Sequence, residues 1–189
     1  MQLFNAPMQT IHCTQKLLKE LGKQGATIPK SETQHSFLGP WHANLIRIER
    51  RKCILFTNDF TLYSFLVPGV KKADLNNFRD MFLLHLRINL IKEGFSAEDI
   101  HNTLVEYEEI AVAPTTNRSV LGSMNDLVNQ SDSLVHRAGG LDKADILVVN
   151  MLINRIPMGA LKYQYPIEKL YERFGRQDKV SLPVNPFHF

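Results

Sequence analysis

The sequence predicts an α+β fold in which a small antiparallel sheet packs against four to five helices. Residues 43–67 contain three β-rich runs with connections of three residues, and connections that short join antiparallel strands. An N-terminal strand is expected to complete this sheet. After Pro68-Gly69 the apolar residues change to a period near 3.6, which is typical of helices packed on a core.

The N-terminal part predicts a strand, a helix and a loop. Residues 8–13 are expected to form a short strand, and residues 14–22 a helix. Thr14 offers a hydroxyl group that can cap the first turn of this helix, and Gly22 is a suitable C-terminal stop. The polar stretch 23–39 contains glycine and proline and therefore predicts a loop.

The strongest strand signal is the predicted meander. Its strands are residues 43–48, 52–57 and 61–67, and turns at residues 49–51 and 58–60 connect them. The β-branched and aromatic side chains in these runs favour a pleated, buried sheet.

The next segment predicts a buried central helix and a second, capped helix. Residues 75–91 are apolar nearly all round, which indicates burial on every side, and Gly94 ends the helix. The run Ser96–Asp99 resembles a capping box and starts a helix that reaches about Glu109. Residues 110–114 are expected to form a short extended piece.

Three amphipathic segments predict the remaining helices. The first carries an apolar stripe over residues 120–135 and ends at Gly139-Gly140. The second covers residues 144–152 with apolar residues at i, i+3, i+4, i+7 and i+8, and Pro157 ends it. The third covers residues 166–174, with a proline at the first helical position.

The composition is that of a globular protein and excludes several classes. Of 189 residues 44% are hydrophobic and 22% charged, so disorder, collagen-like repeats and disulfide-stapled miniproteins are not expected. One domain over residues 1–175, followed by a loose tail at 176–189, can bury a sufficient core. The net charge of +3, from 22 Lys+Arg against 19 Asp+Glu, is too small to indicate nucleic-acid binding by itself.

Location is predicted from what the sequence lacks. Residues 1–7 have neither the basic start nor the apolar stretch of a signal peptide, and no window holds the eighteen or so apolar residues of a membrane span. Cys13 and Cys53 are the only cysteines and form no CxxC pair, so reduced thiols are the simplest interpretation. We therefore expect a cytoplasmic protein with no membrane contact.

Catalytic and metal-binding motifs are absent from the sequence. There is no P-loop, dinucleotide fingerprint, zincin helix or hydrolase elbow. Pairing of the first strand with the meander would bring together a Cys2His2 set, but its spacing matches no zinc motif and neighbouring strand residues point to opposite faces. The set is His12, Cys13, His42 and Cys53. We expect no metal and no cofactor, and we interpret His85 as a hydrogen-bonded core histidine.

The densest polar segment is residues 115–126, at the start of an amphipathic helix. Free amides of a first turn, a cap from Thr116 or Asn117 and the Arg118 guanidinium could hold a phosphate or carboxylate. The alternative is a well-capped helix in which Arg118 pairs with Asp126 or another carboxylate. Both interpretations stay open at this point.

A mid-helix glycine, Gly122, is unusual because glycine costs about 1 kcal/mol relative to alanine in a helix. Close approach of another backbone or of a ligand would explain it. A tight crossing of this helix over the sheet is the explanation we prefer from the sequence.

Four segments of the chain carry a resemblance to known proteins: CTQKLL at 13–18, WHANL at 41–45, LFTN at 55–58 and TNRSVLGSMND at 116–126. Together they resemble a family of small prokaryotic proteins that is classed as a domain of unknown function. The resemblance covers about residues 8–130 and implies a prokaryotic, cytosolic, single-domain protein, with no activity attached. We name its shared polar positions the candidate polar patch: Lys16, Trp41, Asn44, Asn58, Arg118, Ser119, Asn125 and Asp126.

A second likeness lies at residues 154–166, which are similar to the Asn-x-Arg-Pro-x-x-x-Leu-x-Tyr-x-x-Pro tail of transposase and integrase catalytic domains. Ile156 departs from it, because those domains usually carry arginine there. Their chemistry also needs three carboxylates that hold two metals, and the first strand has no acidic residue. We interpret the segment as a helix stop, a turn and a helix start, with Leu161 and Tyr163 packed under two prolines.

These observations favour a binding or interaction protein that uses the candidate polar patch, centred on the helix start at Arg118, to recognise an anionic or polar ligand or a protein partner. A homodimer through the apolar surplus of the helical half would fit this class. The alternatives are an enzyme acting on nucleotides or nucleic acid, and a component of a mobile-element or toxin–antitoxin-like system. Convergence of Lys16, Asn44, Asn58 and Asp126 on one pocket would favour the enzyme, and dispersal the interaction protein.

Overall fold

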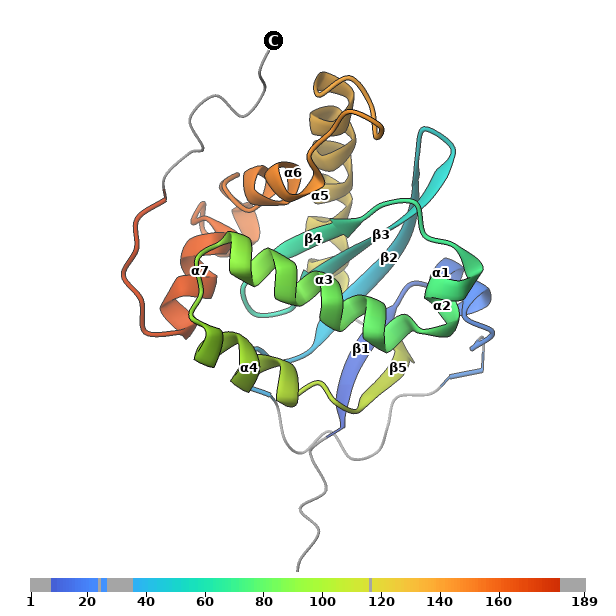
Figure 1. The fold of residues 1–189 in the computed structure, drawn as a ribbon, viewed down its shortest axis with the longest axis horizontal. Coiled ribbons are helices and arrows are strands. Elements are labelled where there is room, and N and C mark those ends of the chain that lie inside the picture. Colours follow the sequence, from blue (N-terminus) through green and yellow to red (C-terminus); the bar gives the residue numbers. More distant parts are fainter. Residues whose placement is uncertain (1–7, 24, 27–35, 116, 181–189) are drawn as a thin grey trace, which may run out of the picture.

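A computed structural model describes residues 8–23, 25–26, 36–115 and 117–180 of the chain. Its centre is a five-stranded sheet in the order β4-β3-β2-β1-β5, with helices on both faces (Figure 1). The strands are β1 (Gln9–Cys13), β2 (Trp41–Ile48), β3 (Arg51–Asn58), β4 (Ser64–Val67) and β5 (Ile110–Pro114).

The sheet is mixed, which corrects the antiparallel sheet predicted from the sequence. The meander β2-β3-β4 is antiparallel as predicted. The N-terminal strand β1, however, runs parallel to both of its neighbours, β2 and β5. Long connections precede β2 and β5, and a long connection is what lets two neighbouring strands run parallel. The predicted extended piece at 110–114 is therefore an edge strand of the same sheet.

The described residues contain seven α-helices and one 3-10 turn, and α2 and α3 form the segment predicted as a single central helix. They are α1 (Gln15–Glu20), α2 (Lys72–Asn76), α3 (Phe78–Lys92), α4 (Ala97–Val105), α5 (Arg118–Arg137), α6 (Ile146–Ile153), the turn Gly159–Leu161 and α7 (Pro166–Arg173).

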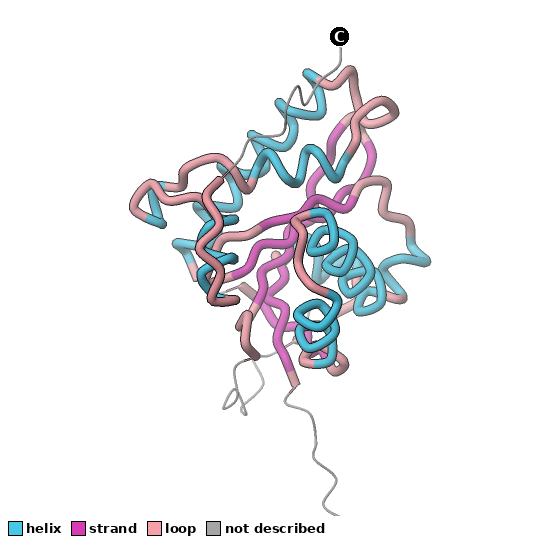
Figure 2. Tube along the Cα trace, turned by 60° about the vertical axis from the view of Figure 1, so that its left-hand side comes forward, coloured by secondary structure: helices cyan, strands magenta, loops and turns pink. Residues whose placement is uncertain are grey.

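The sheet separates two hydrophobic cores, so the fold has a helical layer on each side. On one face α1, α2, α3, α4 and α7 surround the aromatic side chains of Trp41, Phe56 and Phe65. On the other face α5 and α6 pack against Ile46 and Leu55. Figure 1 shows α3 in front of the strands and α5 behind them, and Figure 2 shows helices on both sides of the strands.

The helix starts predicted at Ser96, Asn117 and Pro166 are confirmed, and the predicted cap of α1 is wrong. The Ser96 hydroxyl caps α4, Asn117 caps α5 through its side-chain oxygen, and Pro166 opens α7. The Thr14 hydroxyl does not cap α1. It donates instead to Oδ1 of Asn44 on β2, 3.2 Å away, because the parallel pairing of β1 and β2 brings the two side chains together.

Helix α6 covers the β4 edge of the sheet. Oδ1 of Asn154 accepts from the Ser64 backbone N–H and its Nδ2 donates to the Ser64 carbonyl, both at 2.7 Å. One turn earlier, Asn150 makes the same pair of contacts with Leu66, at 2.8 and 3.3 Å, and also donates to Asn89 of α3. The two amides replace a sixth strand and satisfy an edge that would otherwise be open to pairing.

The integrase-like segment is structural in this fold. As predicted, α6 stops, a turn follows and α7 starts. Arg155 reaches back to α3, where its guanidinium binds the carboxylate of Glu93 at 2.7 and 3.0 Å, with both side chains buried. The predicted packing of Tyr163 is wrong: Lys162 and Tyr163 both adopt positive φ, and the turned backbone leaves Tyr163 78% exposed.

Two predicted irregular segments fall partly outside the described residues, namely positions 24 and 27–35 of the loop at 23–39 and positions 181–189 of the tail. At the start of the predicted tail the guanidinium of Arg176 lies 4.5 Å from the ring centre of Tyr171. Over the described part of the chain, each helix is too short or too polar to cross a bilayer.

Candidate functional site

Two residues of the candidate polar patch, Trp41 and Asn58, serve the fold. Trp41 is fully buried and its Nε1 donates to the hydroxyl of Tyr107 at 3.0 Å. Asn58 is also fully buried. Its Nδ2 donates to the Leu38 carbonyl at 2.8 Å, while its Oδ1 accepts from the backbone N–H of Thr61 at 3.0 Å. The Trp41 indole therefore ties β2 to Tyr107, which lies between α4 and β5, and the Asn58 amide holds the turn between β3 and β4.

Two further patch residues, Lys16 and Asn44, lie near the carboxyl end of β1. Lys16 is exposed on α1, and Asn44 is half-buried on β2 with its oxygen bound to Thr14. The Thr115 N–H donates to the Cys13 carbonyl at 3.3 Å, which joins the carboxyl ends of β5 and β1. Helices α1 and α5 therefore start at the same end of the sheet, although they pack on opposite faces.

The remaining patch residues lie together on one exposed side of α5. Helix α5 turns its apolar side chains toward the sheet and α6, which leaves the opposite side for water. Arg118, Ser119, Asn125 and Asp126 are all exposed, and so is Gly122 between them. We name this surface the outer face of α5: Arg118, Ser119, Gly122, Asn125 and Asp126. Its members follow at spacings of three and four residues, so they are neighbours on the helix surface.

The polar side chains of the outer face hold no other part of the described chain in place. Among the described residues, none forms a hydrogen bond or an ion pair with the side chains of Arg118, Asn125 or Asp126. The pairing of Arg118 with Asp126 considered from the sequence is absent there, since about two helical turns, or roughly 12 Å, separate the two positions. Among the described residues the Asn117 side chain caps the amides of the first turn. Thr116, the other cap considered from the sequence, lies outside the described residues.

Arg118 also lies at the electrostatically unfavourable end of its helix. The N-terminus of an α-helix carries a partial positive charge, and a cation there lowers helix stability by a few tenths of a kcal/mol. The first turn of α5 contains no acidic residue that would offset this repulsion. Helix stability therefore gives no reason for an arginine at this position.

Gly122 has open space around it. A Cβ atom built at this position would meet nothing within 4 Å, which shows that neither the sheet nor another helix approaches α5 there. The predicted tight crossing of this helix over the sheet is therefore wrong. Packing within the described ranges therefore does not explain the roughly 1 kcal/mol that glycine costs in a helix.

A second polar cluster lies on the face of the sheet that α5 covers. The rings of His12 and His42 stack with centres 5.0 Å apart, and Nδ1 of His42 lies 2.5 Å from Oδ1 of Asp59. Sequence reasoning missed Asp59. The register His42↔Thr57, continued two residues past Thr57 and so one residue past the end of β3, would have placed it beside the histidine.

The His42 imidazole is oriented by a carboxylate, as in a general base, but its burial gives it no access to a substrate. Asp59 binds Nδ1, which leaves Nε2 as the free position, and Nε2 is buried without a hydrogen-bond partner among the described residues. Cys13 points to the opposite core, where burial raises the pKa of its thiol and keeps it protonated. No group of three or more His, Cys, Asp or Glu side chains in the described ranges could hold a metal ion.

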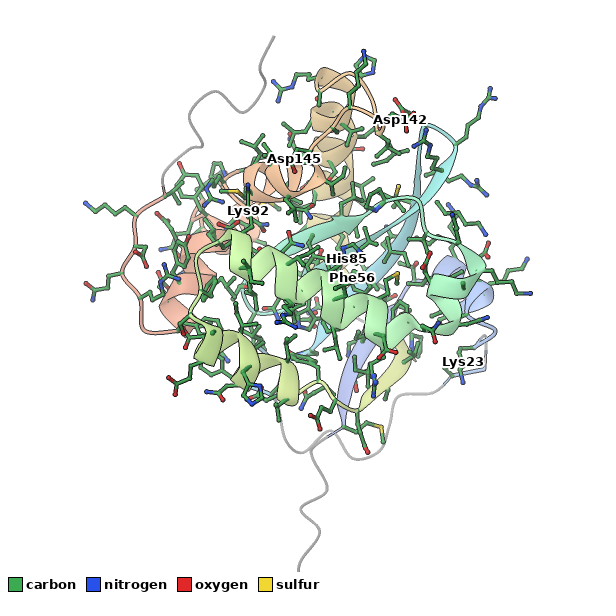
Figure 3. The ribbon with its side chains drawn as sticks, viewed as in Figure 1. Lys23, Phe56, His85, Lys92, Asp142 and Asp145 are labelled. Atoms are coloured by element: carbon green, nitrogen blue, oxygen red, sulfur yellow. The ribbon has the colours of Figure 1, made fainter. Side chains whose placement is uncertain are left out.

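Two cavities lie away from all of these residues. One, of about 330 Å³, lies between α2 and α3 and is lined in part by His85, which is labelled in Figure 3. His85 is half-buried and its ring makes no hydrogen bond to a described residue, so its interpretation as a hydrogen-bonded core histidine is wrong. The other, of about 270 Å³, is lined by Phe37, Phe174 and residues of α4. Neither cavity is lined by a residue of the candidate polar patch.

Comparison with known proteins identifies the family of the chain. A family described as a domain of unknown function (DUF6933) matches residues 10–169, a span that runs from β1 into α7. Searches of curated proteins and of solved structures found no match. The chain therefore belongs to the DUF6933 family, a domain of unknown function.

Proposed function

We propose that the protein is a binding protein that recognises its partner through the outer face of α5. The observation that carries the proposal is the open space at Gly122, on a face whose charged and amide side chains have no partner among the described residues. A glycine that weakens the helix, and whose missing Cβ would meet no other described residue, is explained by a molecule that approaches the helix closely at this point.

The neighbouring side chains fit a polar partner. Arg118 supplies a guanidinium with five donors, Asn125 supplies both donors and acceptors, and Asp126 supplies a carboxylate. Because these groups are exposed and have no partner in the part of the chain that the structure describes, a partner gains their hydrogen bonds without breaking contacts there. We also propose a cytoplasmic location, which is supported by two free cysteines buried in the cores.

The enzyme alternative was expected to use Lys16, Arg118 and Asp126, whereas the structural observation that favours an enzyme is the contact between His42 and Asp59. This alternative stays second because the free Nε2 is buried and because the patch residues are divided among α1, β2, β3 and α5, with none of them lining either cavity described above. The mobile-element alternative is not retained, since Asn154 and Arg155, which carry the integrase likeness, bind β4 and α3.

Site-specific photo-crosslinking in growing cells tests the proposal. A photoreactive amino acid is placed in the full chain at Ser119 or Asn125, with Arg87 on α3 as the control. Arg87 is also exposed on a helix, and that helix packs on the opposite face of the sheet from α5. We expect crosslinked products from both α5 positions and only background from Arg87. Equal yields from all three positions, or none from α5, would refute the proposal.

A further inference from the structure

The outer face of α5 is complementary to itself. Measured from Gly122, Arg118 lies four residues before and Asp126 four residues after, while Ser119 and Asn125 lie three residues on either side. The chain thus carries opposite charges, and a hydroxyl paired with an amide, at equal distances from one central glycine. All five positions are exposed.

We propose that this face binds a second copy of the chain, with the two α5 helices antiparallel and a twofold axis through Gly122. The inference rests on the proposed function and names its partner. In a twofold interface each contact occurs twice, so the same patch must complement itself. With antiparallel helices, a residue before the axis on one copy faces the residue equally far after the axis on the other.

This arrangement pairs every group of the face. Four residues correspond to about 6 Å of helix, so Arg118 of one copy lies opposite Asp126 of the other at both ends of the contact. Ser119 lies opposite Asn125, where the hydroxyl and the amide can exchange a hydrogen bond. Gly122 meets Gly122 at the axis, where the absence of Cβ atoms lets the two backbones approach closely.

The register is specific to Gly122. An axis through Asn129, about two turns further along α5, would place Asp126 of one copy opposite Asp132 of the other, and like charges at that distance repel. No other glycine lies within α5. The axis through Gly122 therefore brings opposite charges together, and it does so at the position where the helix can be approached most closely.

The affinity is expected to be modest. One helix pair buries less than the roughly 1,200 Å² of a stable interface, and the charge pairs at its ends remain in contact with water. We therefore expect a dimer whose population rises with concentration and falls as salt screens the ion pairs.

Sedimentation of the purified full chain, at concentrations up to about 1 mM, tests the inference by charge reversal. Arg118→Asp places two acidic residues at each end of the contact, and Asp126→Arg places two basic ones. We expect a dimer for the wild type and at least tenfold weaker association for each single variant. Association should recover in the double variant and in an equimolar mixture of the two single variants, since both restore opposite charges. Arg87→Asp on α3 changes the net charge equally and should leave the dimer intact.

Two results would overturn the inference: a wild type that remains monomeric over the whole range, or single variants that associate as well as Arg87→Asp. Neither result would refute the proposed function, which the crosslinking experiment tests separately. Crosslinked products from Ser119 and Asn125 whose mass differs from that of a dimer would show that α5 binds a different partner. The variant Gly122→Ala separates association from folding. It fills the open space without strain, so it should fold at least as stably as the wild type while the added methyl groups weaken the dimer.

Discussion

The side-chain amide of Asn154 exchanges two hydrogen bonds of 2.7 Å with the backbone of Ser64, one with its N–H and one with its carbonyl. An asparagine on a helix thereby acts as the neighbouring strand for the edge of the sheet. Both partners are buried, and α6 is held against β4 by these contacts as well as by its apolar side chains.

Asn154→Ala is expected to lower the free energy of unfolding by about 2–4 kcal/mol, because it leaves two buried backbone groups without a partner. Urea denaturation measures the loss. Asn125→Ala is the matched control, since that amide is exposed and its removal should change stability by less than about 0.5 kcal/mol. Equal effects of the two substitutions would contradict the role given to Asn154.

The buried ion pair between Glu93 and Arg155 is expected to show strong coupling. Burial raises the pKa of Glu93, while the Arg155 guanidinium opposes that shift. Removing one partner leaves a charge in the core, so Glu93→Gln and Arg155→Met should each destabilise the protein by about 3–5 kcal/mol. The double variant should lose much less than the sum of the two losses. Additive losses in a double-mutant cycle would show that the two side chains do not depend on each other.

Gly122→Ala should raise the free energy of unfolding of the monomer by about 0.5–1 kcal/mol, because alanine favours the helix and the new methyl group meets nothing within 4 Å. Gly140→Ala provides the contrast. Gly140 has a φ of +96°, and a Cβ atom there would collide with the Glu49 carboxylate, so this second change should destabilise the protein. Thermal unfolding at low protein concentration distinguishes the two, and a loss of stability in Gly122→Ala would mean that the chain itself needs this glycine.

Stability is expected to fall as the pH drops through the histidine range. Burial lowers the pKa of His85 below its ordinary value of 6.5, with Asp74 acting in the opposite direction. The unfolded chain then binds the proton more readily than the folded chain, so the contribution of this residue to stability is present above about pH 6.5 and is lost below it.

The measurement is urea unfolding at about pH 7 and at about pH 5.5, for the wild type and for His85→Gln. The variant should lose less stability over that interval because glutamine takes up no proton. Ring resonances of His85 that titrate above pH 6.5 in the folded protein would contradict the assignment.

Local sequence patterns predicted most helices and strands of the fold, but they could not predict contacts between segments that are distant in sequence. The meander and the apolar stripe of α5 depend on neighbours in sequence, and both were predicted. The parallel pairing of β1 with β2 and β5 depends on strands that are distant in sequence and that leave no local mark. The Thr14 hydroxyl binds Asn44 instead of its own helix for the same reason.

Only the structure shows which residues of the candidate polar patch are buried within the fold and which are exposed. Trp41 and Asn58 carry polar atoms that the sequence could not distinguish from a binding site, yet both are buried and bonded within the fold. Gly122 was singled out correctly as unusual, but its surroundings could not be read from its spacing. The contact of His42 with Asp59 needed the strand register, which no sequence pattern gives directly.

The most direct test of the outer face of α5 as a recognition surface is the photo-crosslinking yield from Asn125 in cells, measured with and without Arg118→Asp in the same chain. The two residues share no contact, so the substitution leaves the chemistry of the crosslinker unchanged. If Arg118 and Asn125 belong to one surface, the yield should fall at least tenfold, while Arg87→Asp should leave it unchanged. An undiminished yield from the Arg118→Asp chain would contradict the account.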